Sequence, residues 1–295
     1  MKVLILGAYG FLGMHLSRHL ESEGFYVIKL GRSCSADIKY VHQHDSSRLP
    51  SILEKIKPDI IINLIALTNV DLCETQPRLA YELNTDLPSL LTSALLTINK
   101  QPLVIHVSTD QVYDGKGPHS ELSDVKPANT YSLTKLFGEF KIESNHTLIL
   151  RTNFVGRSLV ASKSSFSDWI INSLNSSTEI RGFNDIFFTP LHISSLCHFI
   201  TIAIKSRITG LYNLGCSSGI DKGSFMLKLC DALQLNKGLI TLGPETSGFN
   251  NQRARRPKDM RLDSTKFQET TNVVLPSIDN EICKLANEYR ERKIY

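Results

Sequence analysis

Residues 2–24, KVLILGAYGFLGMHLSRHLESEG, predict a strand, a glycine-rich turn and a helix in direct succession. Residues 2–6 form a continuous aliphatic run, which is typical of a strand buried on both faces of a sheet. Residues 11–23 repeat their apolar side chains at helical spacing, and Gly24 follows as a helix C-cap. A chain that opens in this way favours an α/β fold with a parallel sheet.

The turn between this strand and helix carries three glycines, Gly7, Gly10 and Gly13, in the spacing GxxGxxG. Glycines there permit a tight turn, a close approach of the backbone to a pyrophosphate, and close packing of helix on strand. The helix N-terminus supplies N–H groups for the phosphates. We therefore predict a dinucleotide site that also includes Phe11 and Leu12; a plain glycine-rich turn is the alternative.

Aliphatic runs and helical patterns alternate along the first half of the chain. The predicted strands are 2–6, 25–30, 59–65, 103–108 and 147–150, and the predicted helices are 11–23, 47–57, 77–99 and 131–144. Such alternation implies βαβ units with right-handed crossovers, and hence a Rossmann-like doubly wound parallel sheet in the α/β class.

Beyond about residue 152 the alternation loosens, although 165–176, 193–205 and 279–293 have helical patterns. We expect an NAD(P)-binding Rossmann domain over residues 1–151, on which 190–207 packs back. Residues 152–295 are expected to form, in the main, a smaller interleaved domain that binds the substrate.

The composition is that of a soluble globular protein, since 41% of the 295 residues are hydrophobic and 21% are charged. A net charge of +4 is too small to indicate nucleic acid binding. No apolar run approaches the roughly 20 residues needed to cross a bilayer, and the N-terminal apolar segment lacks a signal-peptide cleavage site. The six cysteines have no metal or redox spacing. These features predict a cytoplasmic protein with no metal centre and with neither a nucleic acid nor a membrane partner.

The end of the second predicted strand bears on the choice of cofactor. An acid usually stands there in NAD-binding proteins, where it bonds the ribose hydroxyls, but this chain has Arg32 followed by Ser33. Because an arginine suits a 2′-phosphate, Arg32 favours NADPH, with NADH left open; the alternative is that Arg32 only stacks on the adenine. Asp45 is a candidate to bond the adenine amino group, or equally to cap the helix after it.

A second motif is YSLTK, residues 131–135. Residues four apart on a helix share a face, so the Lys135 ammonium is expected to lower the pKa of Tyr131, which is otherwise near ~10. YxxxK alone is common by chance, but here it follows Thr109, at the carboxyl end of a strand, where ligands bind in open α/β sheets. We predict Thr109, Tyr131 and Lys135 as catalytic residues, with Thr109 polarising a carbonyl and Tyr131 giving it a proton.

The segment RARRPK, residues 253–258, is locally basic. Arginine and lysine pair well with phosphate, so one interpretation is an anion-binding loop in which Arg255, Arg256 and Lys258 form a compact cluster. The other interpretation is a solvated loop.

With these motifs, the chain resembles the extended short-chain dehydrogenases/reductases, and within them the dTDP-4-dehydrorhamnose reductase-like group. The resemblance rests on residues 7–13, 63–71, Glu74, Asn84, 108–115, Glu121, Pro127, Asn129, Tyr131, Lys135, Gly138, Glu139, Arg151, Thr152, Arg256 and Pro257. It implies that Thr109, Tyr131 and Lys135 form the catalytic triad. It also implies that Leu64, Ile65 and Ala66 line the cofactor, and that Thr68, Asn153, Phe154 and Arg256 contact a nucleotide-sugar substrate.

Three departures from the family pattern stand out. Ser132 replaces the usual glycine after the catalytic tyrosine, and Asn153-Phe154 stands where family reductases tend to have Ser-Trp against the sugar, which leaves the sugar open. His15 occupies a position where some members carry a glutamate linked to magnesium-dependent dimerisation. No metal is therefore carried over, and a homodimer stays open.

The resemblance implies an NAD(P)H-dependent reductase of a nucleotide-activated 4-keto-6-deoxy sugar, in deoxysugar and polysaccharide biosynthesis. One alternative is a nucleotide-sugar epimerase or dehydratase of the same fold. Dehydration is disfavoured because Gln111 follows Asp110 where dehydratases carry a glutamate, and an amide cannot take a proton. The other alternative is a non-catalytic, NADP-binding regulatory subunit similar to that of methionine adenosyltransferase.

Overall fold

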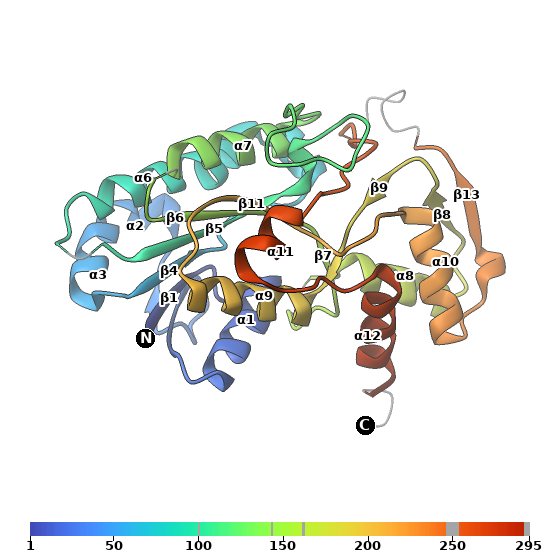
Figure 1. Cartoon of the computed structure of the whole chain (residues 1–295), viewed down its shortest axis with the longest axis horizontal. Coiled ribbons are helices and arrows are strands. Elements are labelled where there is room, and N and C mark those ends of the chain that lie inside the picture. Colours follow the sequence, from blue (N-terminus) through green and yellow to red (C-terminus); the bar gives the residue numbers. More distant parts are fainter. Residues whose placement is uncertain (100, 143, 161–162, 246–253, 292–295) are drawn as a thin grey trace.

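The computed structural model describes residues 1–99, 101–142, 144–160, 163–245 and 254–291. Its centre is a sheet of seven parallel strands in the order β11-β6-β5-β4-β1-β2-β3 (Figure 1). The strands are β1 Lys2–Leu6, β2 Tyr26–Gly31, β3 Ile38–Lys39, β4 Ile60–Asn63, β5 Leu103–Thr109, β6 Thr147–Thr152 and β11 Gly210–Leu214. The prediction of a doubly wound parallel sheet is confirmed.

Helices cover both faces of this sheet because neighbouring strand residues point in opposite directions. In β1, Val3 and Ile5 belong to one buried cluster, whereas Leu4 and Leu6 belong to another. The first cluster includes α1 (Phe11–Ser22) and α9 (Ile193–Ser206), and the second includes α3 (Leu49–Ile56), α6 (Leu87–Leu95) and the end of α7 (Thr130–Ile142). Figure 1 shows α6 and α7 on the face opposite α1 and α9.

Most of the remaining segments lie beyond one end of this sheet (Figure 1). Three two-stranded sheets pair β10 with β7, β12 with β9, and β13 with β8. The elements are β7 Phe154–Val155, α8 Phe166–Asn175, β8 Ile180–Phe183, β9 Phe187–Phe188, β10 Leu191–His192, β12 Ile220–Asp221, α10 Lys222–Leu233, β13 Ile240–Gly243, α11 Thr265–Thr271 and α12 Ile278–Glu291. Within the described residues, no helix is both long and apolar enough to span a membrane.

The predicted helix over 77–99 is wrong as one continuous element, because it divides into α5 (Pro77–Tyr81), a π-helical turn Glu82–Asp86, and α6. In the π turn the Asn84 side chain bonds the Leu67 amide at 2.8 Å and the Thr134 hydroxyl at 3.0 Å. A Cβ at Gly138 would overlap the Asn84 carbonyl oxygen, so α7 packs very close to this turn. Widened turns of this kind are frequent near functional sites.

Other predicted boundaries agree to within a few residues. β2 begins one residue late, β4 covers only the middle of the predicted strand 59–65, and α3 starts at Leu49. α3 ends before Lys57, which has a left-handed φ of 49° ahead of Pro58. Lys293, the predicted end of the last helix, lies outside the described residues.

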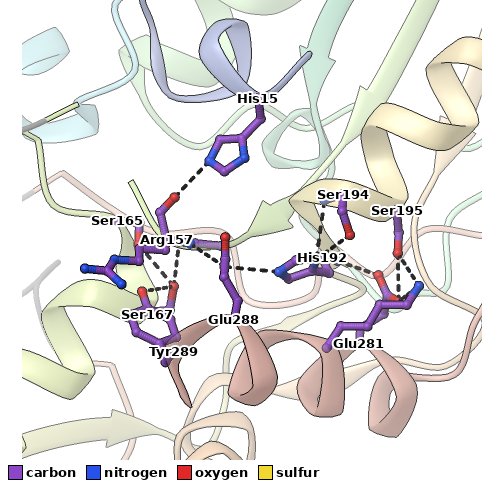
Figure 2. A network of polar contacts seen from close by, with 12 residues as sticks. His15, Arg157, Ser165, Ser167, His192, Ser194, Ser195, Glu281, Glu288 and Tyr289 are labelled. Carbon is purple, nitrogen blue, oxygen red and sulfur yellow. Dashed lines mark hydrogen bonds and ion pairs between the residues drawn. The ribbon is translucent and has the colours of Figure 1, made fainter. Parts of the chain in front are cut away.

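A polar network links the C-terminal helix α12 to α1, α9 and Arg157 (Figure 2). Glu288 accepts a hydrogen bond from the Arg157 amide at 2.9 Å and lies 3.2 Å from His192, the N-cap residue of α9. His15 of α1 bonds the Arg157 carbonyl at 2.9 Å, and the fully buried Glu281 accepts from Ser195 at 2.9 Å. α1, α9 and α12 are therefore held to one another by polar contacts as well as by apolar packing.

A buried ion pair joins α7 to the sheet. The Arg151 guanidinium of β6 bonds the Glu139 carboxylate of α7, with a shortest distance of 2.6 Å, and both side chains are at most 4% exposed. Ser108 of β5, which stands opposite Arg151 in the strand register, donates to the same carboxylate. Arg151 also donates to the Tyr113 hydroxyl at 2.7 Å. This cluster fixes α7 against the carboxyl ends of β5 and β6.

We predict that Glu139→Gln lowers the free energy of unfolding by about 3–5 kcal/mol, because it leaves the Arg151 charge buried without a counterion. Urea denaturation measures this loss. The control is Lys237→Met, which removes an exposed ion pair with Asp231 and should cost at most about 1 kcal/mol. A Glu139→Gln variant no less stable than the control would show that the buried pair does not hold the fold together.

Candidate active site

The three predicted catalytic residues meet at the carboxyl end of β5. Thr109 is the last residue of that strand, and Tyr131 and Lys135 lie one turn apart on the buried face of α7. A hydrogen bond links the side chains of Tyr131 and Thr109. All three are at most 8% exposed, so the hydroxyls and the ammonium share a nearly dry environment.

Lys135 is anchored beneath this centre. Its ammonium donates to the Val107 carbonyl at 2.8 Å and lies 3.4 Å from His106 Nε2, while His106 Nδ1 lies 3.1 Å from the Asn63 amide. Burial lowers the pKa of Lys135 to about 8, and Glu139 opposes this shift. Burial, reinforced by the Lys135 charge, holds the pKa of His106 well below its usual value, so His106 is neutral.

The expected effect of Lys135 on Tyr131 is not what the structure shows. Burial raises the pKa of Tyr131, and the hydrogen bond with Thr109 only partly opposes that rise. The reason is that the Lys135 ammonium is directed to Val107 and His106. Without a bound ligand, Tyr131 is therefore a fully protonated, weakly acidic group.

Asp110 is a further titratable group in the site. It is completely buried, and burial raises its pKa to about 7, although Asn153 donates to its carboxylate at 2.8 Å and Thr109 at 3.3 Å. Asn153, one of the predicted substrate residues, is thus engaged with Asp110. Phe154, its predicted neighbour in substrate binding, has its ring 5.5 Å from that of Phe11.

Two polar atoms near this centre have no hydrogen-bond partner among the described residues. They are the buried side-chain oxygens of Gln111 and Thr152. Thr152 stands opposite Thr109 in the register of β5 and β6, and Gln111 directly follows Asp110. Because an unpaired buried polar atom costs free energy, hydroxyl groups of a substrate are suitable partners for both.

The glycine-rich turn forms a cradle with the properties that a pyrophosphate needs. Gly7 has a φ of +85°, and a Cβ there would lie 3.1 Å from the Ile65 amide nitrogen. A Cβ at Gly13 would lie 2.7 Å from the carbonyl carbon of Ala8, so α1 packs directly on the turn. The first turn of α1 has no acidic residue, and Gly10 provides no side-chain cap. Its amide groups, which include those of Phe11 and Leu12, are therefore free of side-chain bonds and suit an anion.

The other predicted cofactor residues surround this cradle. Leu64, Ile65 and Ala66 follow β4, and the Leu64 amide bonds the Leu6 carbonyl at 2.9 Å, which brings this segment beside the cradle. Arg32 is exposed just beyond the end of β2. Thr68 is exposed in the loop that leads to Asn69, the N-cap residue of α4 (Val70–Thr75).

Asp45 is the last residue of the short helix α2 (His42–Asp45). Its carboxylate accepts hydrogen bonds from the Val41 amide at 2.8 Å and from Arg48 at 2.6 Å. Asp45 directly precedes the short 3₁₀ helix Ser46–Arg48, and a role as the cap of that helix stays a prediction. The adenine contact stays a prediction.

The basic loop does not form the compact cluster that the sequence suggested. Arg255 pairs with Asp114 at 2.5 Å, Arg256 with Asp71 at 3.0 Å, and Lys258 with Asp185 at 2.7 Å. Each cation is thus drawn toward a different carboxylate, because acids from three separate segments surround the loop. Gly248 and Arg253, which the sequence places in the same stretch, lie outside the described residues.

Sequence reasoning missed Lys222, the first residue of α10. Its charge lowers the pKa of Asp110, and it lies within electrostatic range of Arg256. Lys222 is more than 110 residues away from Asp110 along the chain, so no local sequence motif could have predicted that the two residues lie within electrostatic range.

Comparison with known proteins shows the family of this chain. The family model described as RmlD substrate binding domain matches residues 1–291. A dTDP-4-dehydrorhamnose reductase of Shigella flexneri is 29% identical over 304 residues, which cover 98% of each chain. The crystal structure of a dTDP-4-dehydrorhamnose reductase from Clostridium acetobutylicum is similar with a TM-score of 0.85 at 24% identity, covering 98% of this chain and 100% of that one.

A third relative was solved with a ligand. The structure of dTDP-4-dehydrorhamnose reductase from Bacillus anthracis strain Ames in complex with NADP has a TM-score of 0.83 at 22% identity, covering 97% of this chain and 99% of that one. At this identity the likeness shows a shared fold. The predicted family resemblance is confirmed by the family match, which extends over almost all of the 295 residues: the chain belongs to the RmlD substrate binding domain family.

Proposed function

We propose that this protein is an NADPH-dependent reductase that converts the keto group of a nucleotide-activated 4-keto-6-deoxy sugar to a hydroxyl. The observation that carries the proposal is the convergence of Thr109, Tyr131 and Lys135 beside the glycine cradle of a dinucleotide fold. Membership of the family supports it, as does the similarity to reductases of dTDP-4-dehydrorhamnose.

Tyr131, Thr109 and Lys135 are each assigned a different role in carbonyl reduction. Bound NADPH supplies the hydride that the carbonyl carbon accepts. Tyr131 gives its phenolic proton to the carbonyl oxygen, which Thr109 polarises through its hydroxyl. Lys135 is assigned to the nicotinamide ribose, and with a pKa of about 8 it is mostly charged at neutral pH. Burial of the three side chains keeps water away from the reacting atoms.

Cofactor binding is assigned to the cradle of Gly7, Gly10 and Gly13 and to the segment 64–66. Arg32 is assigned to the 2′-phosphate, a role that its exposure at the end of β2 permits. The complex of the Bacillus anthracis relative with NADP supports the same choice. NADPH is therefore the proposed cofactor, with Asp45 near the adenine.

The substrate side of the site is assigned mainly to residues 152–295, with Thr68 from the first half. Asn153 and Phe154 border the sugar, and Arg256 binds the diphosphate. A cytoplasmic location and a homodimer are predictions that accompany this proposal.

Tyr131→Phe should lower turnover of dTDP-4-dehydrorhamnose with NADPH by at least ~10²-fold, the usual contribution of a positioned general acid. NADPH affinity, measured by fluorescence titration, should stay the same. Tyr26→Phe, at a tyrosine that is 66% exposed, is the matched control. Near-normal turnover in Tyr131→Phe would remove this residue from the mechanism. Tight NADPH binding without turnover by the unaltered protein would instead favour the regulatory-subunit alternative.

Arg32→Asp should reverse the cofactor preference. Removing one charge-assisted bond to the 2′-phosphate, worth about 1.5–3 kcal/mol, should lower kcat/KM for NADPH by roughly 10- to 100-fold. The new acid should raise kcat/KM for NADH through bonds to the ribose hydroxyls. The control is Arg78→Asp, at an arginine of α5 that is 94% exposed. Equal kinetics with both cofactors in the unaltered protein and in Arg32→Asp would show that Arg32 does not contact the 2′-phosphate.

Arg256→Ala should raise the KM for the nucleotide sugar roughly tenfold or more while leaving NADPH affinity unchanged, because one bond to the diphosphate is lost. Its ion pair with Asp71 leaves the Arg256 side chain 24% exposed and so open to a ligand. Arg255→Ala, at a neighbour that is 61% exposed and paired with Asp114, is the control. An unaltered KM at moderate salt would place the diphosphate contact elsewhere.

A further inference from the structure

Lys222 carries a positive charge between the catalytic centre and the basic loop. The Lys222 amide bonds the Ile186 carbonyl, and the residue after Ile186, Phe187, donates its amide to the Lys258 carbonyl at 2.8 Å. Burial raises the pKa of Asp110 and lowers that of Lys222, and the charge of each group opposes the shift of the other. The start of α10 therefore lies beside the basic loop, and the Lys222 charge is within electrostatic range of Asp110.

The backbone of Lys222 is firmly held. Its amide bonds the Ile186 carbonyl at 2.9 Å, and Asp221 caps α10 by accepting from the Ser224 amide at 2.8 Å. Gly223 packs so closely on Gly182 that a Cβ would lie 3.3 Å from its carbonyl carbon. The start of α10 therefore cannot move without disturbing β8.

The side chain of Lys222 is oriented by two aromatic rings. Its ammonium lies 5.3 Å from the centre of the Phe166 ring and 5.7 Å from that of Phe188. Ring faces attract a cation without neutralising it. In the described part of the chain, Lys222 forms no ion pair within 4 Å, whereas Arg256 and Lys258 each have a carboxylate partner. Lys222 is thus a partly buried cation that lacks an anion.

We propose that Lys222 binds the sugar-linked phosphate of the nucleotide sugar and so sets how the sugar ring meets Tyr131. The inference rests on the proposed function. In a nucleotide sugar the diphosphate is attached at the end of the ring opposite the 4-keto carbon, so a sugar whose carbonyl meets Tyr131 directs its phosphate away from Thr109. Lys222 binds this sugar-linked phosphate, and Arg256 binds the adjacent, nucleoside-linked phosphate.

A simpler role, as a counterion that only keeps Asp110 ionised, explains less. The Asp110 carboxylate already accepts hydrogen bonds from Asn153 and Thr109, and no ion pair within 4 Å joins it to Lys222. That role would change the pH profile of turnover without changing affinity for a nucleoside diphosphate. The two roles therefore differ in a measurable quantity.

The test is calorimetric titration of the protein, saturated with NADP⁺, with dTDP, UDP, GDP and CDP, and then with the monophosphate of the one that binds best. Lys222→Met should weaken diphosphate binding roughly tenfold or more, the scale of one charge-assisted bond, and should change monophosphate binding by less than about twofold. Lys222→Arg should restore most of the loss. Lys228→Met, which removes the same charge from an exposed position on α10, is the matched control and should bind both as before.

Turnover then separates this inference from the proposed function. Lys222 does not bind the sugar-linked phosphate if Lys222→Met binds the diphosphate as tightly as the unaltered protein, or if its affinities for diphosphate and monophosphate fall equally. In either case, continued NADPH oxidation would leave the reductase proposal intact. If the unaltered protein binds none of the four diphosphates and reduces no nucleotide sugar, both fall. Lys222→Gln replaces the Met variant if the latter does not fold, as judged by circular dichroism and NADP⁺ binding.

Discussion

The buried ion pair between Glu139 and Arg151 is the constraint on which the rest of the site depends. Two charges removed from water are stable together only when their geometry is close to ideal, and here the carboxylate is bonded by Arg151 and also by Ser108. Glu139 lies one helical turn beyond Lys135, and Ser108 directly precedes Thr109. The pair therefore fixes the distance between the two elements that carry the predicted catalytic groups.

Around this pair the protein places a set of dry, polar groups whose ionisation is shifted in opposite directions. Burial raises the pKa of Asp110 to about 7, lowers that of Lys135 to about 8, and keeps His106 neutral. Both shifted groups titrate near neutrality, so a ligand that brings a charge or excludes more water can change their protonation. Folding therefore provides the free energy that the burial of these groups costs.

Much of this could be predicted from the sequence, because the signals are local. Alternating aliphatic and helical segments specify a parallel sheet, and the spacing of Tyr131 and Lys135 places both on one helical face. The features that could not be predicted depend on contacts between distant segments. The π turn at Asn84 exists because Leu67 and Thr134 bond its side chain, and the spread of the basic loop exists because Asp71, Asp114 and Asp185 attract it. Lys222 had no local signal, because the fold brings its charge within electrostatic range of Asp110 from a distant segment of the chain.

The most direct test of the reductase account follows the hydride itself. NADPH carrying deuterium at the transferable position of the nicotinamide would be incubated with the protein and a set of nucleotide 4-keto-6-deoxy sugars, and the products identified by NMR. The account predicts one deuterium at the sugar C4, in a single configuration, with an equal amount of NADP⁺ formed. Recovery of every sugar without deuterium, whether unchanged or isomerised, would contradict it.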